Sequence, residues 1–241
     1  MKFREYLPLF EGDLWSEGRR RLGDKLELYD SMQRQINNRY KDVVTYREFI
    51  KKFCALNVSS GMHELLLSMD PCTKWDAEEI SREIEGTSAT DLGCCDGTLT
   101  IFYALNHPEI EFTGVDMCHE AVDIATEKSR ARGAKNTRFV CADVMSCEGE
   151  YFSADTLIAQ GSVYQFLPHL TDYNRNFMET IRHGLRTGCK VILSQSIPNK
   201  SDQFRPEKVD GYKLLRYDTK TVHSLPLETD LSSEIAVFRT I

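Results

Sequence analysis

Several features that would place a chain in a membrane or in an oxidising compartment are missing from this sequence. It has no apolar run near the roughly 20 residues that a membrane-spanning helix needs. Residues 1–6 lack the hydrophobic core of a signal peptide. The eight cysteines are scattered, without a C-x-x-C pair or the spacing of a metal site. These absences predict a cytoplasmic protein with reduced thiols, no metal site and no membrane partner.

An excess of positive charge is also missing. The chain has 30 Lys and Arg against 37 Asp and Glu, a net charge of −7. This balance argues against a large nucleic-acid footprint, although it allows a local basic patch. The basic clusters at 19–21 and 128–135 are interpreted as solvated helix faces. With 241 residues and 41% hydrophobic composition, we expect a globular protein of one domain, or one domain with an appendage.

The most informative stretch has the sequence DLGCCDG and covers residues 91–97. Two glycines opened by Asp91 predict a strand that turns tightly into a helix. Glycine lets the backbone take positive φ and lets a ligand approach the main chain, and the free N–H groups of the helix start then face that ligand. Asp116 ends an apolar run near the spacing at which an acidic residue reaches a ribose in dinucleotide folds. These features predict a nucleotide-type site.

The third glycine of the dinucleotide pattern G-x-G-x-x-G is absent, which disfavours an NAD-dependent dehydrogenase. The pattern D-x-G-x-C-x-G instead resembles motif I of class I S-adenosylmethionine (SAM)-dependent methyltransferases, [DE]-x-G-x-G-x-G. The main departure is Cys95, which puts a side chain where the middle glycine of the family lets the backbone approach the ligand. The expected first strand, 88–92, is also more polar than buried parallel strands usually are.

The resemblance continues in order over about residues 87–196. Asp116 matches the acidic residue that the family places on the ribose hydroxyls, and Asp143 matches the one near the adenine amino group. Residues 155–166 resemble the fourth strand and the loop beneath the reactive methyl, and 185–193 resemble the passage through a glycine into the fifth strand. The resemblance implies SAM as the cofactor, bound by Asp91, Gly93, Cys95, Gly97, Asp116, Met117, Asp143, Val144 and Gln160.

Purely structural roles stay open for some of these residues. Gly93 and Gly97 could serve only a tight strand–helix turn. Asp116 could be a carboxylate favoured by a helix N-terminus, and Asp143 could be a turn residue.

Residues 1–86 are predicted to form helices only. One amphipathic helix is indicated by an apolar stripe at steps of three and four, made of Leu22, Leu26, Tyr29, Met32, Ile36 and Tyr40. Thr45 and Glu48 fit a capping box that opens another helix. Pro71 is expected to end the helix at 61–69, and a short helix is expected at 73–84. The stretch 85–88 is the expected boundary between a helical cap, residues 1–86, and a SAM-binding domain, residues 87–241.

From residue 87 onward, strands and helices alternate, which predicts parallel strands with right-handed crossovers and helices on both faces. Strands are expected at 88–92, 110–116, 137–142, 155–160 and 189–196, and helices at 97–106, 119–132 and 172–186. Segments 212–222 and 233–240 could close the sheet edge, where the resembled family has an antiparallel last strand. The predicted fold class is α/β, a Rossmann-like doubly wound sheet with a helical N-terminal cap.

Methyl transfer from a sulfonium is an in-line displacement, so positioning and the exclusion of water provide most of the catalysis. A general base is needed only where the acceptor must lose a proton. Tyr164 and His169, which follow the fourth strand, are the candidate catalytic residues, and His63 is a weaker candidate. The adjacent Cys94 and Cys95 are interpreted as small fillers rather than as a reactive pair.

The methyl acceptor has more than one interpretation. No N-P-P-Y-like segment follows the fourth strand, which removes the best signal for methylation of amides or nucleobase amino groups, and 161–164 resembles the loops of small-molecule enzymes in the family. The first hypothesis is therefore a small-molecule acceptor, with residues 1–86 as a lid over the strand ends. A tRNA or protein acceptor, or a non-catalytic SAM-binding subunit, are the alternatives. The methylated atom and the oligomeric state are not predicted.

Overall fold

The computed structural model describes residues 1–37, 43–144, 149–161, 177–179, 181–197, 209–224 and 229–241. Its centre is a seven-stranded sheet of order β3-β2-β1-β4-β5-β7-β6. The strands are β1 (Ser88–Leu92), β2 (Glu111–Asp116), β3 (Thr137–Cys141), β4 (Thr156–Gln160), β5 (Lys190–Ile197), β6 (Tyr212–Ser224) and β7 (Thr229–Thr240). Strands β1 to β5 are parallel, and β7 is antiparallel to both β5 and β6. The predicted Rossmann-like sheet with an antiparallel last strand is confirmed.

The helices after β1 and β2 lie where the sequence predicts them. They are α7 (Thr98–Asn106) and α8 (His119–Arg132). Helix α8 ends at Gly133, whose φ of 73° suits the left-handed position that closes a helix. The helix predicted at 172–186 lies partly outside the described residues, of which 177–179 and 181 are helical and Arg182–Gly184 form a 3₁₀ turn, η4. A second such turn, η3 (Gly149–Phe152), precedes β4.

The sheet has an apolar core on each face, because neighbouring residues of a strand point to opposite sides. In β4, Ile158 packs on one face, and Leu157 and Ala159 pack on the other. Helix α7, helix α6 (Pro71–Glu83) and residues 3–7 cover the face of Ile158. Burial on both faces explains why β4 is a nearly continuous apolar run.

The polar strand β1 is nevertheless central in the sheet. Thr90 and Asp91 are only 3% and 4% exposed. The Thr100 hydroxyl, in the first turn of α7, donates a hydrogen bond to Asp91 Oδ2. A buried carboxylate with a donor inside the protein is tolerated, so this bond explains how a polar strand can sit in the middle of the sheet.

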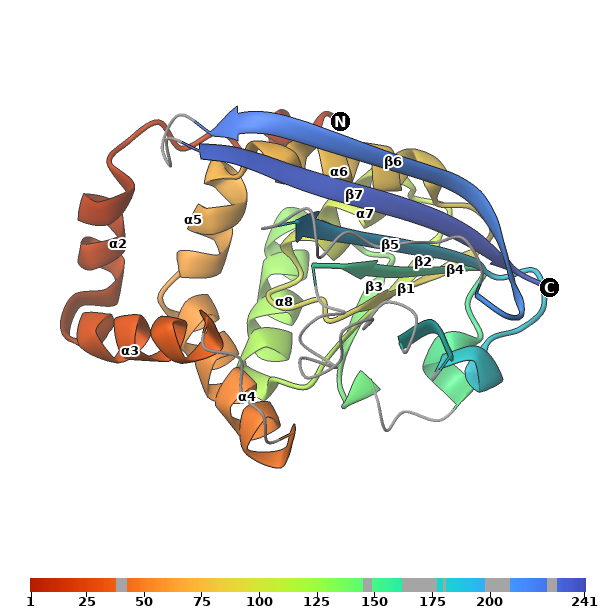
Figure 1. Cartoon of the computed structure of the whole chain (residues 1–241), viewed down its shortest axis with the longest axis horizontal. Helices are drawn as coiled ribbons and strands as arrows, with labels where there is room; N and C mark the ends of the chain where they lie inside the picture. Colours follow the sequence, from red (N-terminus) through yellow and green to blue (C-terminus); the bar gives the residue numbers. More distant parts are fainter. Residues whose placement is uncertain (38–42, 145–148, 162–176, 180, 198–208, 225–228) are drawn as a thin grey trace.

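Four helices before α6 form a unit that we call the cap, residues 14–69. They are α2 (Leu14–Leu22), α3 (Leu26–Asn37), α4 (Val43–Ser59) and α5 (Met62–Met69), preceded by α1 (Phe3–Tyr6) and interrupted by the 3₁₀ turn η1 (Gly23–Lys25). The cap lies at one end of the molecule, beyond the carboxyl ends of the parallel strands (Figure 1). Helix α6 instead contacts β5, β6 and β7 and shares the core of the sheet. The division of the chain into a cap of residues 1–86 and a SAM-binding domain of residues 87–241 stays a prediction.

Two predicted details of the cap are wrong. The apolar stripe that starts at Leu22 does not belong to one helix, because Gly23 takes a φ of 54° after α2 and α3 begins only at Leu26. The two helices on either side of Gly23 nevertheless share one apolar cluster, which includes Leu22 and Met32. Thr45 does not cap α4, which begins two residues earlier, at Val43. The last residue of the stripe, position 40, lies outside the described residues.

Pro71 follows the end of α5, as predicted, and it also begins α6, two residues before the expected start. Proline suits the first helical position, where its missing N–H has no partner in any case. Asp70 caps the helix, since its carboxylate accepts from the Cys72 N–H at 2.8 Å and from the Thr73 hydroxyl at 3.1 Å.

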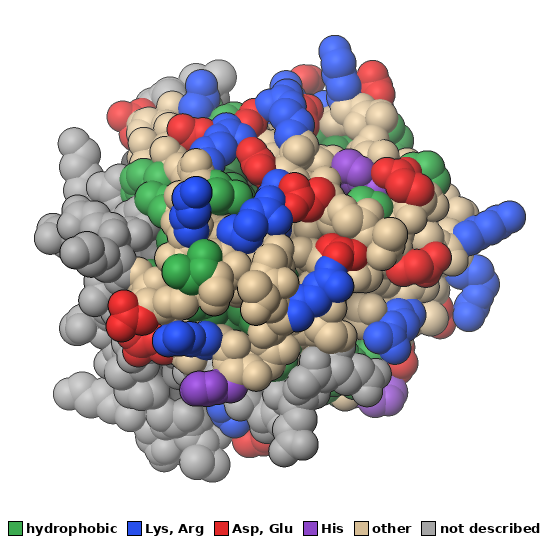
Figure 2. Space-filling model, turned by 90° about the vertical axis from the view of Figure 1, so that its right-hand side faces the viewer, with side chains coloured by type: hydrophobic (Ala, Val, Ile, Leu, Met, Phe, Trp, Pro, Cys, Tyr) green, Lys and Arg blue, Asp and Glu red, His purple; other side chains and the backbone are tan. Residues whose placement is uncertain are grey.

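Charged side chains of both signs alternate on the face that looks away from the cap (Figure 2). Ion pairs also join α6 and the residues that follow it to the last two strands. Arg216 pairs with Glu79 and Glu83, and Arg239 pairs with Glu85. Within the described part of the chain, the helices include none with the length and apolarity of a membrane span.

Candidate active site

A cavity of about 360 Å³ lies between the carboxyl ends of the strands and helices α3 to α6. It is lined by eight of the nine residues predicted to bind the cofactor: Asp91, Gly93, Cys95, Asp116, Met117, Asp143, Val144 and Gln160. The fold therefore brings together residues from the ends of four strands, as expected where an open α/β sheet binds a ligand.

The ninth residue, Gly97, does not line the cavity. Its φ is 71°, and a Cβ built on it would lie 2.8 Å from Ala125 Cβ and from the ring of Phe139. Both the backbone conformation and the packing of α7 against α8 and β3 therefore require glycine here. A contact between Gly97 and the cofactor stays a prediction.

Cys95 stands out in the loop after β1, because it is the one non-glycine residue with positive φ, 50°, in the described chain. Glycine takes this conformation without steric cost, whereas a residue with a Cβ is strained. A hydrogen bond stabilises this conformation, since the Cys95 N–H donates to Asp116 Oδ2 at 2.9 Å. Gly93 and Cys94 donate their N–H groups to the Val115 carbonyl at 2.7 and 3.1 Å.

Asp116 is fixed by the main chain on both sides. The Cys118 N–H donates to its Oδ1 at 2.9 Å, opposite the bond from Cys95. Burial raises the pKa of Asp116, while the backbone donors act in the opposite direction. Each oxygen of an ionised carboxylate has more than one acceptor position, so the side chain can still accept from a ligand hydroxyl. Its orientation is set before any ligand arrives.

Asp91 and Gln160 lie near the carboxyl ends of the neighbouring strands β1 and β4. Burial, helped by the negative charge of Asp116, raises the pKa of Asp91 to about 6, although the Thr100 hydroxyl lowers it. The Tyr103 hydroxyl of α7 donates to Gln160 Oε1 at 2.5 Å. This bond orients the Gln160 amide at the end of β4.

Asp143 has a partner that sequence reasoning missed. Arg47 of α4 places its Nη1 2.6 Å from Asp143 Oδ2, and both side chains are partly exposed. The two residues are 96 positions apart, so no local pattern could have linked them. The pair connects the cap to the loop after β3.

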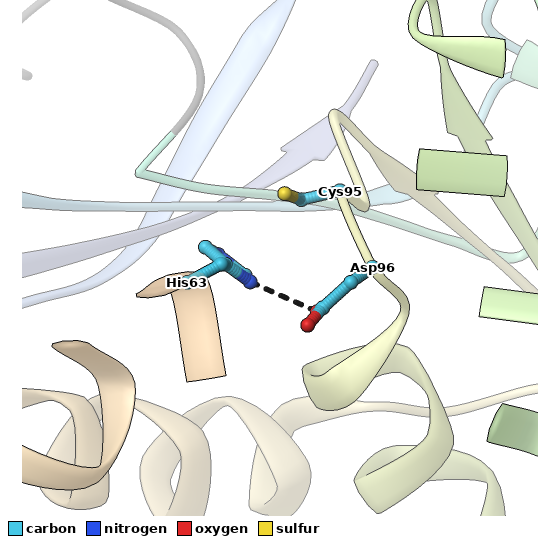
Figure 3. Close-up of side chains that lie close together, drawn as sticks. All are labelled: His63, Cys95 and Asp96. Atoms are coloured by element: carbon cyan, nitrogen blue, oxygen red, sulfur yellow. Dashed lines mark ion pairs between the residues drawn. The ribbon is translucent and has the colours of Figure 1, made fainter. Parts of the chain in front are cut away.

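A second connection between the cap and the sheet is a buried charge cluster around Asp96 (Figure 3). His63 Nδ1 of α5 lies 2.9 Å from Asp96 Oδ1, and Lys128 Nζ of α8 lies 2.8 Å from Asp96 Oδ2. Lys128 also pairs with Glu64 at 2.8 Å. Burial alone would raise the pKa of Asp96, but the positive charges of His63 and Lys128 hold it well below its usual range.

The same cluster shows why His63 is a poor general base at neutral pH. Burial lowers the pKa of His63, but the Asp96 carboxylate outweighs burial and raises it. His63, Cys95 and Asp96 offer ligand atoms within 4.8 Å of one another. The Lys128 ammonium already occupies Asp96, so a divalent cation placed there would meet a positive charge.

Thiols line the contact between α4 and the loop after β1. Cys54 Sγ and Cys95 Sγ lie 3.7 Å apart, and the seven described cysteines are free. The contact with Cys54 lowers the pKa of Cys95, but burial and nearby carboxylates outweigh it and raise this pKa to about 11. Burial also raises the pKa of the Cys94 thiol. Protonated thiols are weak nucleophiles, which favours the interpretation of both residues as fillers.

Comparison with known proteins identifies the sheet part of the chain. Residues 89–188 match a family model described as a methyltransferase domain. These residues belong to a methyltransferase domain, and their fold is that of solved SAM-dependent methyltransferases. The carboxylates at the ends of β1 and β2 and the glycine loop between them therefore belong to that domain, and SAM is its cofactor.

Solved structures share the fold of this methyltransferase domain at low sequence identity. The X-ray structure of YjhP from E. coli is 12% identical, with a TM-score of 0.54, and the match covers 72% of this chain and 95% of that one. Magnesium protoporphyrin IX methyltransferase from Synechocystis PCC 6803, solved with bound SAH, is 15% identical with a TM-score of 0.52, over 69% of this chain and 83% of that one.

A curated relative matches over a short stretch. Ribosomal RNA large subunit methyltransferase G of Pseudomonas putida (strain GB-1) is 37% identical over 76 residues, which are 31% of this chain. The matched stretch spans only 20% of the length of that relative.

The residues around the cavity fit the cofactor of the methyltransferase domain. Asp116 offers a carboxylate in a fixed orientation, Gly93 leaves the main chain open, and Asp91 adds negative charge that suits a cationic sulfonium. The two predicted catalytic residues, Tyr164 and His169, lie outside the described residues, so their roles stay predictions.

Proposed function

We propose that this protein transfers the methyl group of SAM to a small-molecule acceptor. The observation that carries the proposal is the cavity itself. Its walls come from the strand ends on one side and from helices α3 to α6 on the other, so the cap covers the cofactor residues. A covered site of this size suits a small molecule and excludes water.

Binding the cofactor is the task of the strand-end residues. Asp116 would accept from the ribose hydroxyls, and Asp143 from the adenine amino group, where it would share its carboxylate with Arg47. The cofactor supplies an activated methyl group on a sulfonium. The chain contributes the alignment of acceptor, methyl and leaving sulfur and the removal of water, and these provide most of the rate.

An RNA acceptor is the alternative, because a ribosomal RNA methyltransferase is among the relatives. Nucleic-acid binding draws mainly on clustered positive charge. The net charge of −7 and the mixture of charges on the face away from the cap argue against such a cluster there (Figure 2). A SAM-binding subunit without catalysis is the third possibility, which the strained Cys95 keeps open.

Two measurements test the proposal. Calorimetric titration with SAM, with S-adenosylhomocysteine and with NAD should give binding for the first two only. A labelled-methyl assay against small metabolites, ribosomal RNA, tRNA and protein should then transfer label to the small-molecule fraction. Label in RNA or protein would replace the proposed acceptor class, and SAM binding without transfer to any fraction would favour the non-catalytic subunit.

A further inference from the structure

One wall of the cavity carries two buried hydrogen-bond acceptors that the cofactor residues do not explain. Asp76 of α6 and Gln195 of β5 both line the cavity, and they are 4% and 5% exposed. Among the described residues, Asp76 Oδ1, Gln195 Oε1 and the Ser194 hydroxyl of β5 have no hydrogen bond of good geometry, although Ser194 lies close enough to Asp76 to lower its pKa. Buried polar atoms in native proteins are nearly always paired, so a group of exceptions on a cavity wall, with one hydroxyl donor for two acceptors, indicates a missing polar partner.

Hydrogen bonds behind this wall fix the orientation of both side chains. The Ser233 hydroxyl donates to Asp76 Oδ2 at 2.7 Å. The Gln195 amide nitrogen donates to Glu234 Oε1 at 2.5 Å, and the Tyr217 hydroxyl donates to Glu234 Oε2 at 2.7 Å. Because its nitrogen is engaged by a carboxylate, Gln195 must present its carbonyl oxygen, an acceptor, as its free end.

The charges around Asp76 are mostly negative. Asp70 caps the same helix, and Glu234 lies on β7. The hydroxyl groups of Tyr103 in α7 and Ser194 in β5 are close enough to interact with Asp76. The basic side chains among the described lining residues, Lys51 and His63, belong to α4 and α5 on the cap side. Burial raises the pKa of Asp76 to about 8, although the Ser233 and Ser194 hydroxyls lower it.

We propose that Asp76 is the proton acceptor of the methyl transfer and that the acceptor molecule is a small amine, with Gln195 as its second hydrogen-bond partner. The inference rests on the proposed function and specifies its substrate class. The amine would enter as an ammonium ion, whose N–H groups supply the two donors that this wall lacks. A carboxylate and an amide oxygen also compensate the positive charge of the ammonium.

The reaction balances on these groups. Asp76 takes one proton from the bound ammonium and becomes a neutral carboxylic acid, which frees the nitrogen lone pair. That lone pair forms the new N–C bond as the C–S bond breaks, and the bonding electrons go to sulfur, which leaves as the neutral thioether of S-adenosylhomocysteine. The methylated ammonium that results then carries the positive charge.

The acidity of the partners explains why an amine fits better than an alcohol. An alkylammonium such as that of lysine has a pKa of about 10.4, two to three units above a carboxyl group near 8. Ionised Asp76 can therefore take the proton at a moderate cost, and the share of this form grows as the pH rises toward 8. An aliphatic alcohol is a far weaker acid. His63, on the cap side of the cavity, is already paired with the Asp96 carboxylate at 2.9 Å.

The test compares the full-length protein with Asp76→Asn, and uses Asp123→Asn, an exposed carboxylate on α8, as the matched control. The probes are 2-phenylethylamine, its N-methyl derivative and the phenol 4-ethylphenol, each with labelled SAM. We expect the wild type to methylate an amine and Asp76→Asn to lose at least 100-fold in kcat, with the Kd for SAM changed by less than threefold. Asp123→Asn should match the wild type.

Each other outcome has a defined meaning. Transfer to the phenol alone, or SAM binding without transfer to either amine, overturns the amine class. A tenfold loss of SAM affinity in Asp76→Asn overturns the assignment, because it places Asp76 on the cofactor. Failure of the wild type to bind SAM would instead overturn the proposed function.

The pH dependence of Tm, which does not depend on turnover, distinguishes the proposed role of Asp76 from a purely structural effect of Asp76→Asn. A carboxyl whose folded pKa lies above its unfolded value binds more protons in the native state, so it lowers stability as pH rises from about 4 to about 8. We expect Asp76→Asn to gain Tm relative to the wild type at pH 8.5 but not at pH 4.5. Equal shifts in Tm at pH 8.5 and pH 4.5 would show that the pKa of Asp76 is not raised by folding. That result would overturn its role as the proton acceptor.

Discussion

The sheet and the cap are held together in different ways. Large side chains of the sheet region, such as Phe102, Phe112 and Leu157, are at most 1% exposed. The cap has one smaller apolar cluster, whose Met32 is 6% exposed, and its Trp15 is 70% exposed. Apolar burial is the main stabilising term in folding, so most of the stability of the molecule resides in the sheet.

The two regions also meet through a different kind of contact. His63 and Glu64 of the cap meet Asp96 and Lys128, and Arg47 meets Asp143. Thiols and a few apolar residues, among them Val58 and Cys118, complete the contact between α4 and α8. Charged contacts depend on pH and salt, and weakly packed units open more easily than cores. We therefore propose a firm cofactor platform under a cap that can move, and the predictions below test this proposal.

Removing a large core side chain should have the largest effect. Phe102→Ala should lower the free energy of unfolding by about 4 kcal/mol, because it leaves a cavity where α7 packs against Phe3 and Tyr6. Met32→Ala in the cap should cost about 2 kcal/mol and reduce hydrogen-exchange protection mainly within residues 14–69. Urea unfolding and hydrogen exchange measure both. Equal losses, spread over the whole chain, would contradict the division into platform and cap.

Breaking the buried charge cluster should come next. Lys128→Met leaves Asp96 with His63 alone and should cost about 3 kcal/mol, since an uncompensated buried charge is unfavourable. Arg20→Met, which removes an exposed pair with Glu17, should cost less than about 1 kcal/mol and serves as the control. The Lys128→Met variant should lose stability further as pH rises and His63 loses its proton. A pH-independent loss would show that His63 does not compensate Asp96.

Asp116→Ala should weaken SAM binding by about ten- to a hundredfold, because a charge-assisted hydrogen bond is worth about 1.5–3 kcal/mol. Calorimetry measures the Kd, and a thermal unfolding curve verifies that the variant is folded. Asp123→Ala is the matched control. An unchanged Kd in the folded Asp116→Ala protein would remove this residue from the cofactor site.

Cys95→Gly should raise stability by about 1 kcal/mol, since glycine relieves the positive φ of 50°. SAM affinity should stay the same or improve, because a side chain is removed from the approach surface. Cys94→Gly serves as the comparison, because Cys94 lacks a positive φ. Loss of SAM binding in folded Cys95→Gly would mean that the thiol itself contacts the cofactor.

The smallest effect concerns the exposed pair between the cap and the loop after β3. Arg47→Gln should change the free energy of unfolding by less than about 1 kcal/mol, as is usual for partly exposed pairs. If the cap is a lid, SAM should increase hydrogen-exchange protection of residues 47–66 in the wild type, and less so in this variant. Protection that does not respond to SAM in either protein would count against a lid.

Local sequence patterns were enough to predict most of the sheet region. The alternating strands and helices, the limits of α8 and the loop of residues 91–97 follow from periodicity, glycine placement and carboxylate spacing, which are properties of short segments. The errors in the cap arise at Gly23 and Thr45, where the same apolar spacing or capping pattern fits more than one helix limit. Helix α6, grouped with the cap by sequence, packs on the sheet because its apolar face meets β7.

The sequence by itself determined the cofactor motif, because the residues that form it lie next to each strand end and the sheet then aligns those ends. Only the tertiary structure decided which distant side chains complete the site. Arg47 reaches Asp143, Lys128 and His63 enclose Asp96, and Asp76 lies with Gln195 on the cavity wall. These contacts join residues far apart in the chain, and their energy depends on burial and on partner charges, which no short segment of sequence contains.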